Sequence, residues 1–196
     1  MDNKDTNLKE NLKQALTSTA KAISDDYEIK TNTEQNKSSK KFDFFEIDNL
    51  NSKNDFIKAR AEYDSFALKR KFSNDKIFRK NLPLNSSCKS LYSIAEKIRY
   101  ESLGAKMLKG IEKNIKENYN QIINLKRKDQ LKTKDDVPIT EAFELYLRSH
   151  FFKIKQNNAT KKVLSYWKDL FDKNLNKNLK ELDACIENQS KFSQLI

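Results

Sequence analysis

The chain contains only two glycines, Gly104 and Gly110, and both lie in the segment 96–114, which otherwise has the pattern of an unbroken helix. Glycine in a helix interior costs roughly 1 kcal/mol relative to alanine. Its presence there indicates either that another backbone approaches closely or that the residue needs a positive φ angle. We therefore expect this segment to be the most informative part of the chain for packing and function.

The scarcity of glycine also excludes several kinds of catalytic site. Two glycines cannot form a phosphate-binding loop or a hydrolase nucleophile elbow, and the sequence has no zinc or calcium motif. The single histidine, His150, has no second histidine with which to share a metal or a proton. Near the end of a predicted helix, it is favourably placed against the helix dipole. We expect no catalytic residue, metal site or cofactor on this chain.

The chain is basic and rich in lysine. The net charge of +11 comes from 39 basic residues, of which 33 are lysines and six are arginines. The lysines alternate with acidic residues, as they do on a solvated helical surface. No basic cluster contains interleaved aromatic residues, which argues against nucleic-acid binding. Cys88 and Cys185 match no metal-ligand spacing and are expected to be reduced. The polar N-terminus and the absence of a long apolar run predict a cytoplasmic protein without a membrane span.

Apolar residues recur at helical spacing along most of the 196 residues, which we expect to form a single domain. The predicted helices cover 8–25, 55–73, 87–124, 138–151, 157–172 and 175–195. Two short β-prone runs within 27–48 leave room for one small β-hairpin, and 31–40 and 126–136 are expected to be mobile loops. The predicted fold is mainly α, with five or six helices around the long central helix 87–124.

One face of the central helix combines apolar residues with a carboxylate. Its apolar members are Leu108, Ile111, Ile115, Tyr119 and Ile122. Glu101 and Gly104 continue this stripe, so Glu101 points toward the core. A buried carboxylate needs a partner, and Arg60 and Arg70 are the expected ones. Alternatively, Glu101 reaches the edge of the core and stays in contact with water.

A second face of the same helix has the spacing of a packing seam. Its members are Glu96, Arg99, Leu103, Met107, Gly110 and Asn114. Glu96 and Arg99 are three residues apart and can form a local ion pair. Gly110 would allow another helix, or a partner protein, to approach closely. Packing within the chain is the simpler of these two explanations.

These residues carry a resemblance to a known family. The segment 96–114 resembles a pattern in the N-terminal region of CobT, a subunit family of the aerobic cobaltochelatase. The matching residues are Glu96, Arg99, Glu101, Gly104, Met107, Gly110 and Asn114. Further similar positions are Arg60, Asp64, Ala67, Leu68, Trp167, Gln189 and Phe192. The chain departs from the pattern at Ala61, where glycine is expected, and at Ser73 and Asn74, where histidine and aspartate are common.

The resemblance implies an accessory, non-catalytic subunit of the ATP-dependent cobaltochelatase, which inserts cobalt into a corrin ring. Its implied partners are an AAA+ ATPase subunit and the large corrin-binding subunit. Cobalt, ATP and magnesium would belong to the complex and not to this chain. Residues such as Arg60, Asp64, Arg70, Glu96 and Trp167 would then be structural or partner-binding. Family members continue into a von Willebrand factor A-type domain, so we expect a fragment or a short homologue.

Two other hypotheses remain from the sequence. The chain could be a free-standing basic helical protein that binds nucleic acid or another acidic partner. It could also be a degenerate remnant without activity. Salt-dependent DNA binding would identify the first, because binding to phosphates weakens steeply with added salt.

Overall fold

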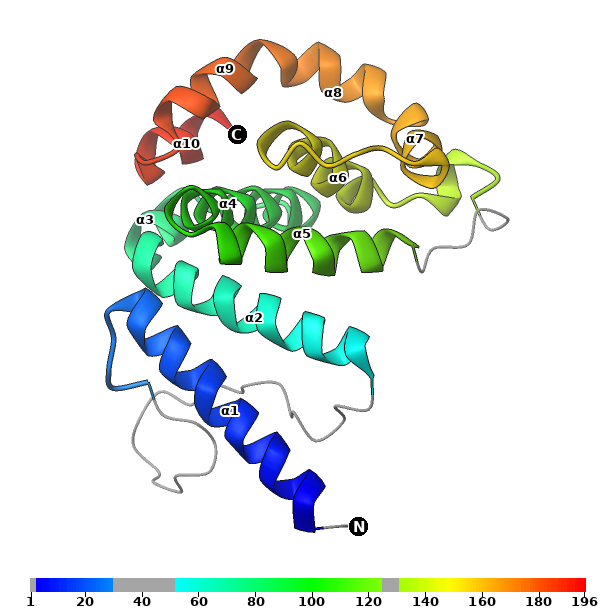
Figure 1. Cartoon of the computed structure of the whole chain (residues 1–196). Helices are drawn as coiled ribbons and strands as arrows, with labels where there is room; N and C mark the ends of the chain where they lie inside the picture. The colour runs from blue at the N-terminus through cyan, green and yellow to red at the C-terminus, as the bar shows by residue number, and fades with distance from the viewer. Residues whose placement is uncertain (1–2, 30–51, 125–130) are drawn as a thin grey trace.

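The computed structural model describes residues 3–29, 52–124 and 131–196. Within these residues the chain forms ten α-helices and one short 3₁₀-helix, which confirms the prediction of a mainly α fold (Figure 1). The helices are α1 (Asn3–Ser24), α2 (Lys53–Phe72), α3 (Asp75–Lys80), α4 (Ser86–Met107), α5 (Lys109–Asn124), α6 (Ile139–Phe151), α7 (Asn158–Ser165), α8 (Lys168–Asn174), α9 (Asn176–Cys185) and α10 (Gln189–Leu195), and the 3₁₀-helix is η3 (Lys134–Asp136).

The helices stack in the order of the chain (Figure 1). Helix α1 packs on α2, and α2 packs on both α4 and α5. Helix α6 covers the other side of α4, while α8 and α9 form an arc beyond α6. Helix α10 returns to contact α3 and α9, which brings the end of the chain back toward α4. Helix α4 thus lies between α2 and α6.

The predicted central helix is divided into α4 and α5 at Leu108, whose backbone is extended with φ −138° and ψ 117°. A straight helix over 87–124 would be about 57 Å long at 1.5 Å per residue. Helix α2, with 20 residues, spans only about 30 Å. Division at Leu108 allows both halves to pack on α2, which one straight helix of that length could not do.

Other predicted helices are also divided, and one short helix had not been predicted. The segment 157–172 is interrupted between Ser165 and Lys168, and 175–195 is interrupted between Cys185 and Gln189. Asn188 caps α10 by accepting a hydrogen bond from the Lys191 N–H at 3.1 Å. The additional helix α3 is capped in the same way by Asn74, which accepts from Lys76 N–H at 2.9 Å. Side-chain caps of this type favour new helix starts over continuation.

Two of the predicted segments fall largely outside the described residues. Of the predicted hairpin, only 27–29 are described, and these residues form a turn and not a strand. The predicted loop 31–40 is not described. In the predicted loop 126–136, the described part contains η3, where the Asp136 carboxylate accepts hydrogen bonds from Thr133 N–H at 2.7 Å and Lys132 N–H at 3.0 Å.

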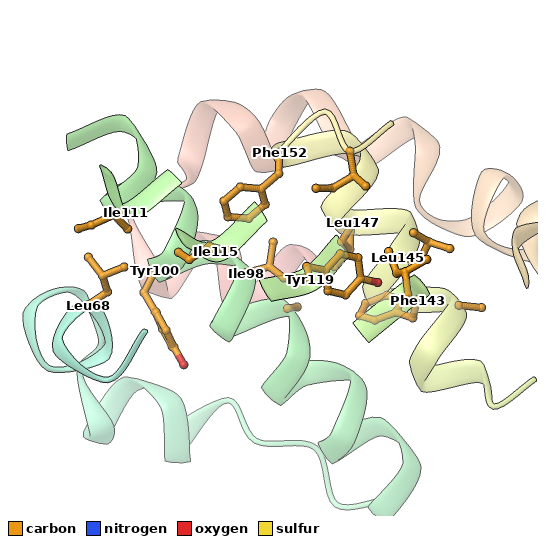
Figure 2. Close-up of a cluster of buried hydrophobic side chains, with 14 of the residues drawn as sticks. Leu68, Ile98, Tyr100, Ile111, Ile115, Tyr119, Phe143, Leu145, Leu147 and Phe152 are labelled. Atoms are coloured by element: carbon orange, nitrogen blue, oxygen red, sulfur yellow. The ribbon is translucent and has the colours of Figure 1, made fainter. Parts of the chain in front are cut away.

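The hydrophobic core joins α2, α4, α5 and α6 (Figure 2). Its labelled members are Leu68, Ile98, Tyr100, Ile111, Ile115, Tyr119, Phe143, Leu145, Leu147 and Phe152. Two residues of the predicted apolar stripe lie outside it: Leu108, at the break between α4 and α5, is 46 % exposed, and Ile122 is 45 % exposed. Across the described ranges, no helix is long and apolar enough to cross a membrane.

Candidate functional site

The first polar cluster in the interior centres on Glu96 and Arg99 of α4. The Arg99 side chain is 1 % exposed and pairs with the Glu96 carboxylate through Nε at 2.8 Å and Nη2 at 2.9 Å. This confirms the predicted local pair. Arg99 also donates to two backbone carbonyls, those of Ile186 and Phe72. One guanidinium therefore ties α4 to the end of α2 and to the turn before α10.

Gln189 completes this cluster from the other end of the chain. Its Nε2 donates to Glu96 Oε1 at 2.9 Å, and its Oε1 accepts from Asn74 N–H at 2.7 Å. Ser73 Oγ donates to the same Glu96 oxygen at 2.6 Å. The positions similar to the family pattern at 96, 99 and 189 thus meet in space. Ser73 and Asn74, which depart from that pattern, lie in the same network.

The second cluster centres on Glu101, which is 2 % exposed, as the helical projection predicted. Its partner is Arg148 of α6, whose Nη2 lies 2.8 Å from Glu101 Oε2. Ser65 Oγ of α2 donates to Glu101 Oε1 at 2.6 Å, and Arg148 Nε donates to Glu144 at 2.8 Å. The carboxylate therefore links α2, α4 and α6, and the alternative in which it reaches water is wrong.

The prediction that Arg60 or Arg70 neutralises Glu101 is wrong. The Arg60 guanidinium lies over the Phe56 ring, 5.7 Å from its centroid, and Arg70 pairs with Asp26. Arg148 was not predicted as the partner, because several arginines have suitable chemistry and spacing within one helix does not select among them. A signal was present, since Arg148 shares a helical stripe with Leu145 and Phe152, both buried.

Aromatic rings surround the Arg148 guanidinium. It lies 4.7 Å from the centroid of Tyr119 and 5.6 Å from that of Phe152. Burial disfavours its charged form, but the carboxylates of Glu101 and Glu144 outweigh burial and hold the pKa of Arg148 above its ordinary value. Burial also raises the pKa of the Tyr119 hydroxyl. The site is therefore a buried ion pair that joins α4 to α6.

A third buried contact joins two more residues of the family-like pattern, Asp64 and Asn114. Asn114 Nδ2 of α5 donates to Asp64 Oδ2 of α2 at 2.6 Å. Burial raises the pKa of Asp64 above its ordinary value of 3.8, while the Asn114 hydrogen bond and the charge of Arg60 oppose this shift. The contact fixes α5 against α2 next to the core.

The raised pKa of Asp64 gives a test by pH. The folded state binds this proton more tightly than the unfolded state, so wild-type stability falls as pH rises through the interval between the two pKa values. Asp64→Asn removes that loss and keeps an oxygen that accepts from Asn114. We expect the Tm of the variant, relative to wild type, to increase in thermal denaturation as pH rises above the ordinary aspartate pKa of 3.8. A Tm difference that is independent of pH would contradict this assignment.

The two glycines have different environments. A Cβ at Gly104 would lie 2.2 Å from Leu68 Cδ2 and 2.8 Å from Leu68 Cγ, so the close neighbour there is a side chain and not the backbone that the sequence predicted. A Cβ at Gly110 would meet nothing within 4 Å. Neither glycine has a positive φ angle. Close approach within the described chain is therefore wrong for Gly110, which lies exposed in the first turn of α5.

The predicted packing seam is interrupted at the same place. Glu96, Arg99, Leu103 and Asn114 are buried, but Met107 is 41 % exposed. Met107 is the last residue of α4, immediately before the break at Leu108. Of the seven residues that match the family pattern, Met107 and Gly110 are the two that are exposed.

The side chains of Trp167 and His150 both make contacts within the chain. The Trp167 indole N–H donates to the Val137 carbonyl at 2.9 Å, and Lys134 Nζ lies 4.1 Å from the centre of the indole. His150, in the last turn of α6, has Nε2 2.9 Å from Asp183 Oδ2. Among the residues that the structure describes, no group of three or more His, Cys, Asp or Glu could hold a metal ion.

Comparison with known proteins relates nearly the whole chain to a protein family. The model of the family described as cobalamin biosynthesis protein CobT matches residues 6–196. No curated protein and no solved structure matches the chain. The matched region includes all three buried polar contacts, at Glu96, Glu101 and Asp64.

Proposed function

Since the chain belongs to the CobT family and so has a role in cobalamin biosynthesis, we propose that it is an accessory subunit of an ATP-dependent cobaltochelatase. In this role it assembles with an AAA+ ATPase subunit and with the large subunit that holds the corrin ring. Cobalt is the metal substrate of that complex, and ATP and magnesium belong to the AAA+ partner. The chain itself contributes binding surfaces and no catalytic residue.

The match over residues 6–196 is the observation that carries this proposal. The structure adds an independent argument about the buried polar residues. Each of the carboxylates of Glu96, Glu101 and Asp64 has a partner from within the chain, and each is at most 5 % exposed. Side chains that are buried and paired within the chain stabilise its fold. Contacts with other subunits are therefore expected from exposed residues of the helices.

Co-expression tests this function directly. The 196-residue chain is produced together with the AAA+ chelatase subunit and the large chelatase subunit of its own genome, and complexes are isolated with and without ATP. Pull-down and native mass spectrometry are expected to show a stable complex with the AAA+ subunit. Failure of the chain to associate with either subunit under both conditions would contradict the proposal.

A titration with duplex DNA tests the alternative function suggested by the net charge of +11. A protein that binds phosphates loses orders of magnitude in affinity as salt increases, so the slope of log K against log salt identifies such binding. We expect no tight binding of the chain to duplex DNA at physiological salt. Tight, steeply salt-dependent DNA binding together with absent subunit binding would favour the nucleic-acid hypothesis.

A further inference from the structure

Gly110 has no explanation within the described part of the molecule. It lies in the first turn of α5, it is exposed, its φ angle is not positive, and a Cβ there would meet nothing within 4 Å. Alanine would be a better helix former at the same position. A bare backbone on an exposed helix turn allows a second molecule to approach more closely than any side chain would permit.

Two exposed apolar side chains precede this glycine. Met107 is 41 % exposed and Leu108 is 46 % exposed. The backbone of Leu108 is held on both sides, because its N–H donates to Gly104 O at 2.9 Å and its carbonyl accepts from Ile111 N–H at 3.0 Å. The two side chains therefore project from a fixed junction between α4 and α5, which lowers the entropy lost when they enter a partner's pocket.

Lysines flank this apolar pair on both sides. Lys106 and Lys109 are exposed, and among the described residues neither forms an ion pair with a carboxylate. The next lysines of α5 differ, since Lys113 lies 3.7 Å from Glu117 and Lys116 lies 2.6 Å from Glu112. The junction thus combines apolar anchors with positive charges that are available to an acidic partner.

We propose that residues 106–110, which we call the junction patch, dock an acidic segment of a partner protein in which carboxylates surround an apolar pocket. Met107 and Leu108 enter the pocket, Lys106 and Lys109 pair with the carboxylates, and Gly110 permits close approach of the partner's backbone. The inference rests on the proposed function, because the partner is taken to be the AAA+ subunit of the same chelatase.

The composition of the patch distinguishes a protein partner from a nucleic acid. Phosphate binding uses the lysines and gains little from Met107 or Leu108. A protein interface depends on its central apolar anchors, and charges at its rim mainly affect the association rate and its salt dependence. The two apolar side chains are therefore the critical residues for the test.

The test measures affinity for the purified AAA+ subunit by calorimetry at two salt concentrations. Three variants of the full chain are compared with wild type: Met107→Ser with Leu108→Ser, Lys106→Glu with Lys109→Glu, and Gly110→Leu. The serine and leucine variants are each expected to weaken binding by at least about tenfold, as the loss of an interface anchor does, and the charge reversal is expected to weaken binding mainly at the lower salt concentration. All changed residues are exposed, so the Tm of the folded chain should change little.

Matched controls carry the same changes elsewhere on the surface. Leu170→Ser alters an exposed leucine of α8, and Lys177→Glu with Lys180→Glu reverses two exposed lysines of α9. These variants should bind within about twofold of wild type, because surface residues outside an interface contribute little.

The outcomes separate this inference from the proposed function. If wild type binds the AAA+ subunit and the patch variants bind equally well, the junction patch is not the docking surface, and the proposed function stands. If the lysine variant loses binding and the serine variant keeps it, the surface is a general cationic site, and the inference is again wrong. If wild type does not bind the subunit at all, both are wrong.

Discussion

Replacing Gly104 with alanine is expected to destabilise the protein by roughly 1–3 kcal/mol, and replacing it with leucine by more. The added Cβ would lie 2.2 Å from Leu68 Cδ2 and 2.8 Å from Leu68 Cγ. Leu68 is fully buried, so it has no solvent-filled space into which it can move. Thermal denaturation should show a drop in Tm of about 2–4 °C for each kcal/mol in a chain of this size.

Gly110 and Leu68 provide the controls for this experiment. Gly110→Ala should leave Tm unchanged or raise it slightly, because alanine favours helix and meets no neighbour. Leu68→Ala alone should cost about 2–5 kcal/mol through the cavity that it leaves. In the double variant Gly104→Ala with Leu68→Ala, the new methyl group occupies part of that cavity, so the two costs should not add. Simple additivity would show that the two residues are not in contact.

Replacing Arg148 with methionine is expected to cost about 3–5 kcal/mol, because it leaves the Glu101 carboxylate buried without its main cation. Glu101 and Arg148 are both nearly inaccessible, and their charged atoms lie 2.8 Å apart. Ser65 would remain as a hydrogen-bond donor and Lys97 Nζ would remain 4.0 Å from Glu101 Oε1, but neither a neutral hydroxyl nor a half-exposed lysine at that distance replaces the buried cation. Chemical denaturation should report the loss as a lower midpoint.

Two further variants determine whether the buried charge is the cause. Adding Glu101→Gln to Arg148→Met removes the unpaired charge, so the double variant should be more stable than Arg148→Met alone. Arg70→Met breaks the pair with Asp26, in which both side chains are partly exposed, and should cost no more than about 1 kcal/mol. If Arg70→Met and Arg148→Met destabilised the protein equally, burial of the Glu101–Arg148 pair would not be the cause of the larger expected loss.

Several features of the site could be predicted because they depend on one helix. Glu96 and Arg99 are one turn apart, so their pairing follows from the geometry of α4 alone. The direction of Glu101 toward the core follows from the spacing of its apolar neighbours in the same way. The partner of Glu101 could not be predicted, since several arginines have suitable chemistry and only the packing of α6 on α4 selects Arg148.

The helix boundaries show the same limit. Apolar periodicity continues through Leu108 without interruption, and so it predicts one helix from 87 to 124. The structure divides this segment because both halves pack on α2, and that requirement comes from an element distant in sequence.

The sequence by itself determined the mainly α fold, the local pair in α4, the inward direction of Glu101 and the likeness to CobT. These properties depend on residue types and on spacings within one helix, which are fixed by the order of residues. Only the tertiary structure decided that Gly104 is covered by Leu68 while Gly110 lies open on the surface. The two glycines are six residues apart, and their different environments arise because α2 packs against one of them and the break at Leu108 exposes the other.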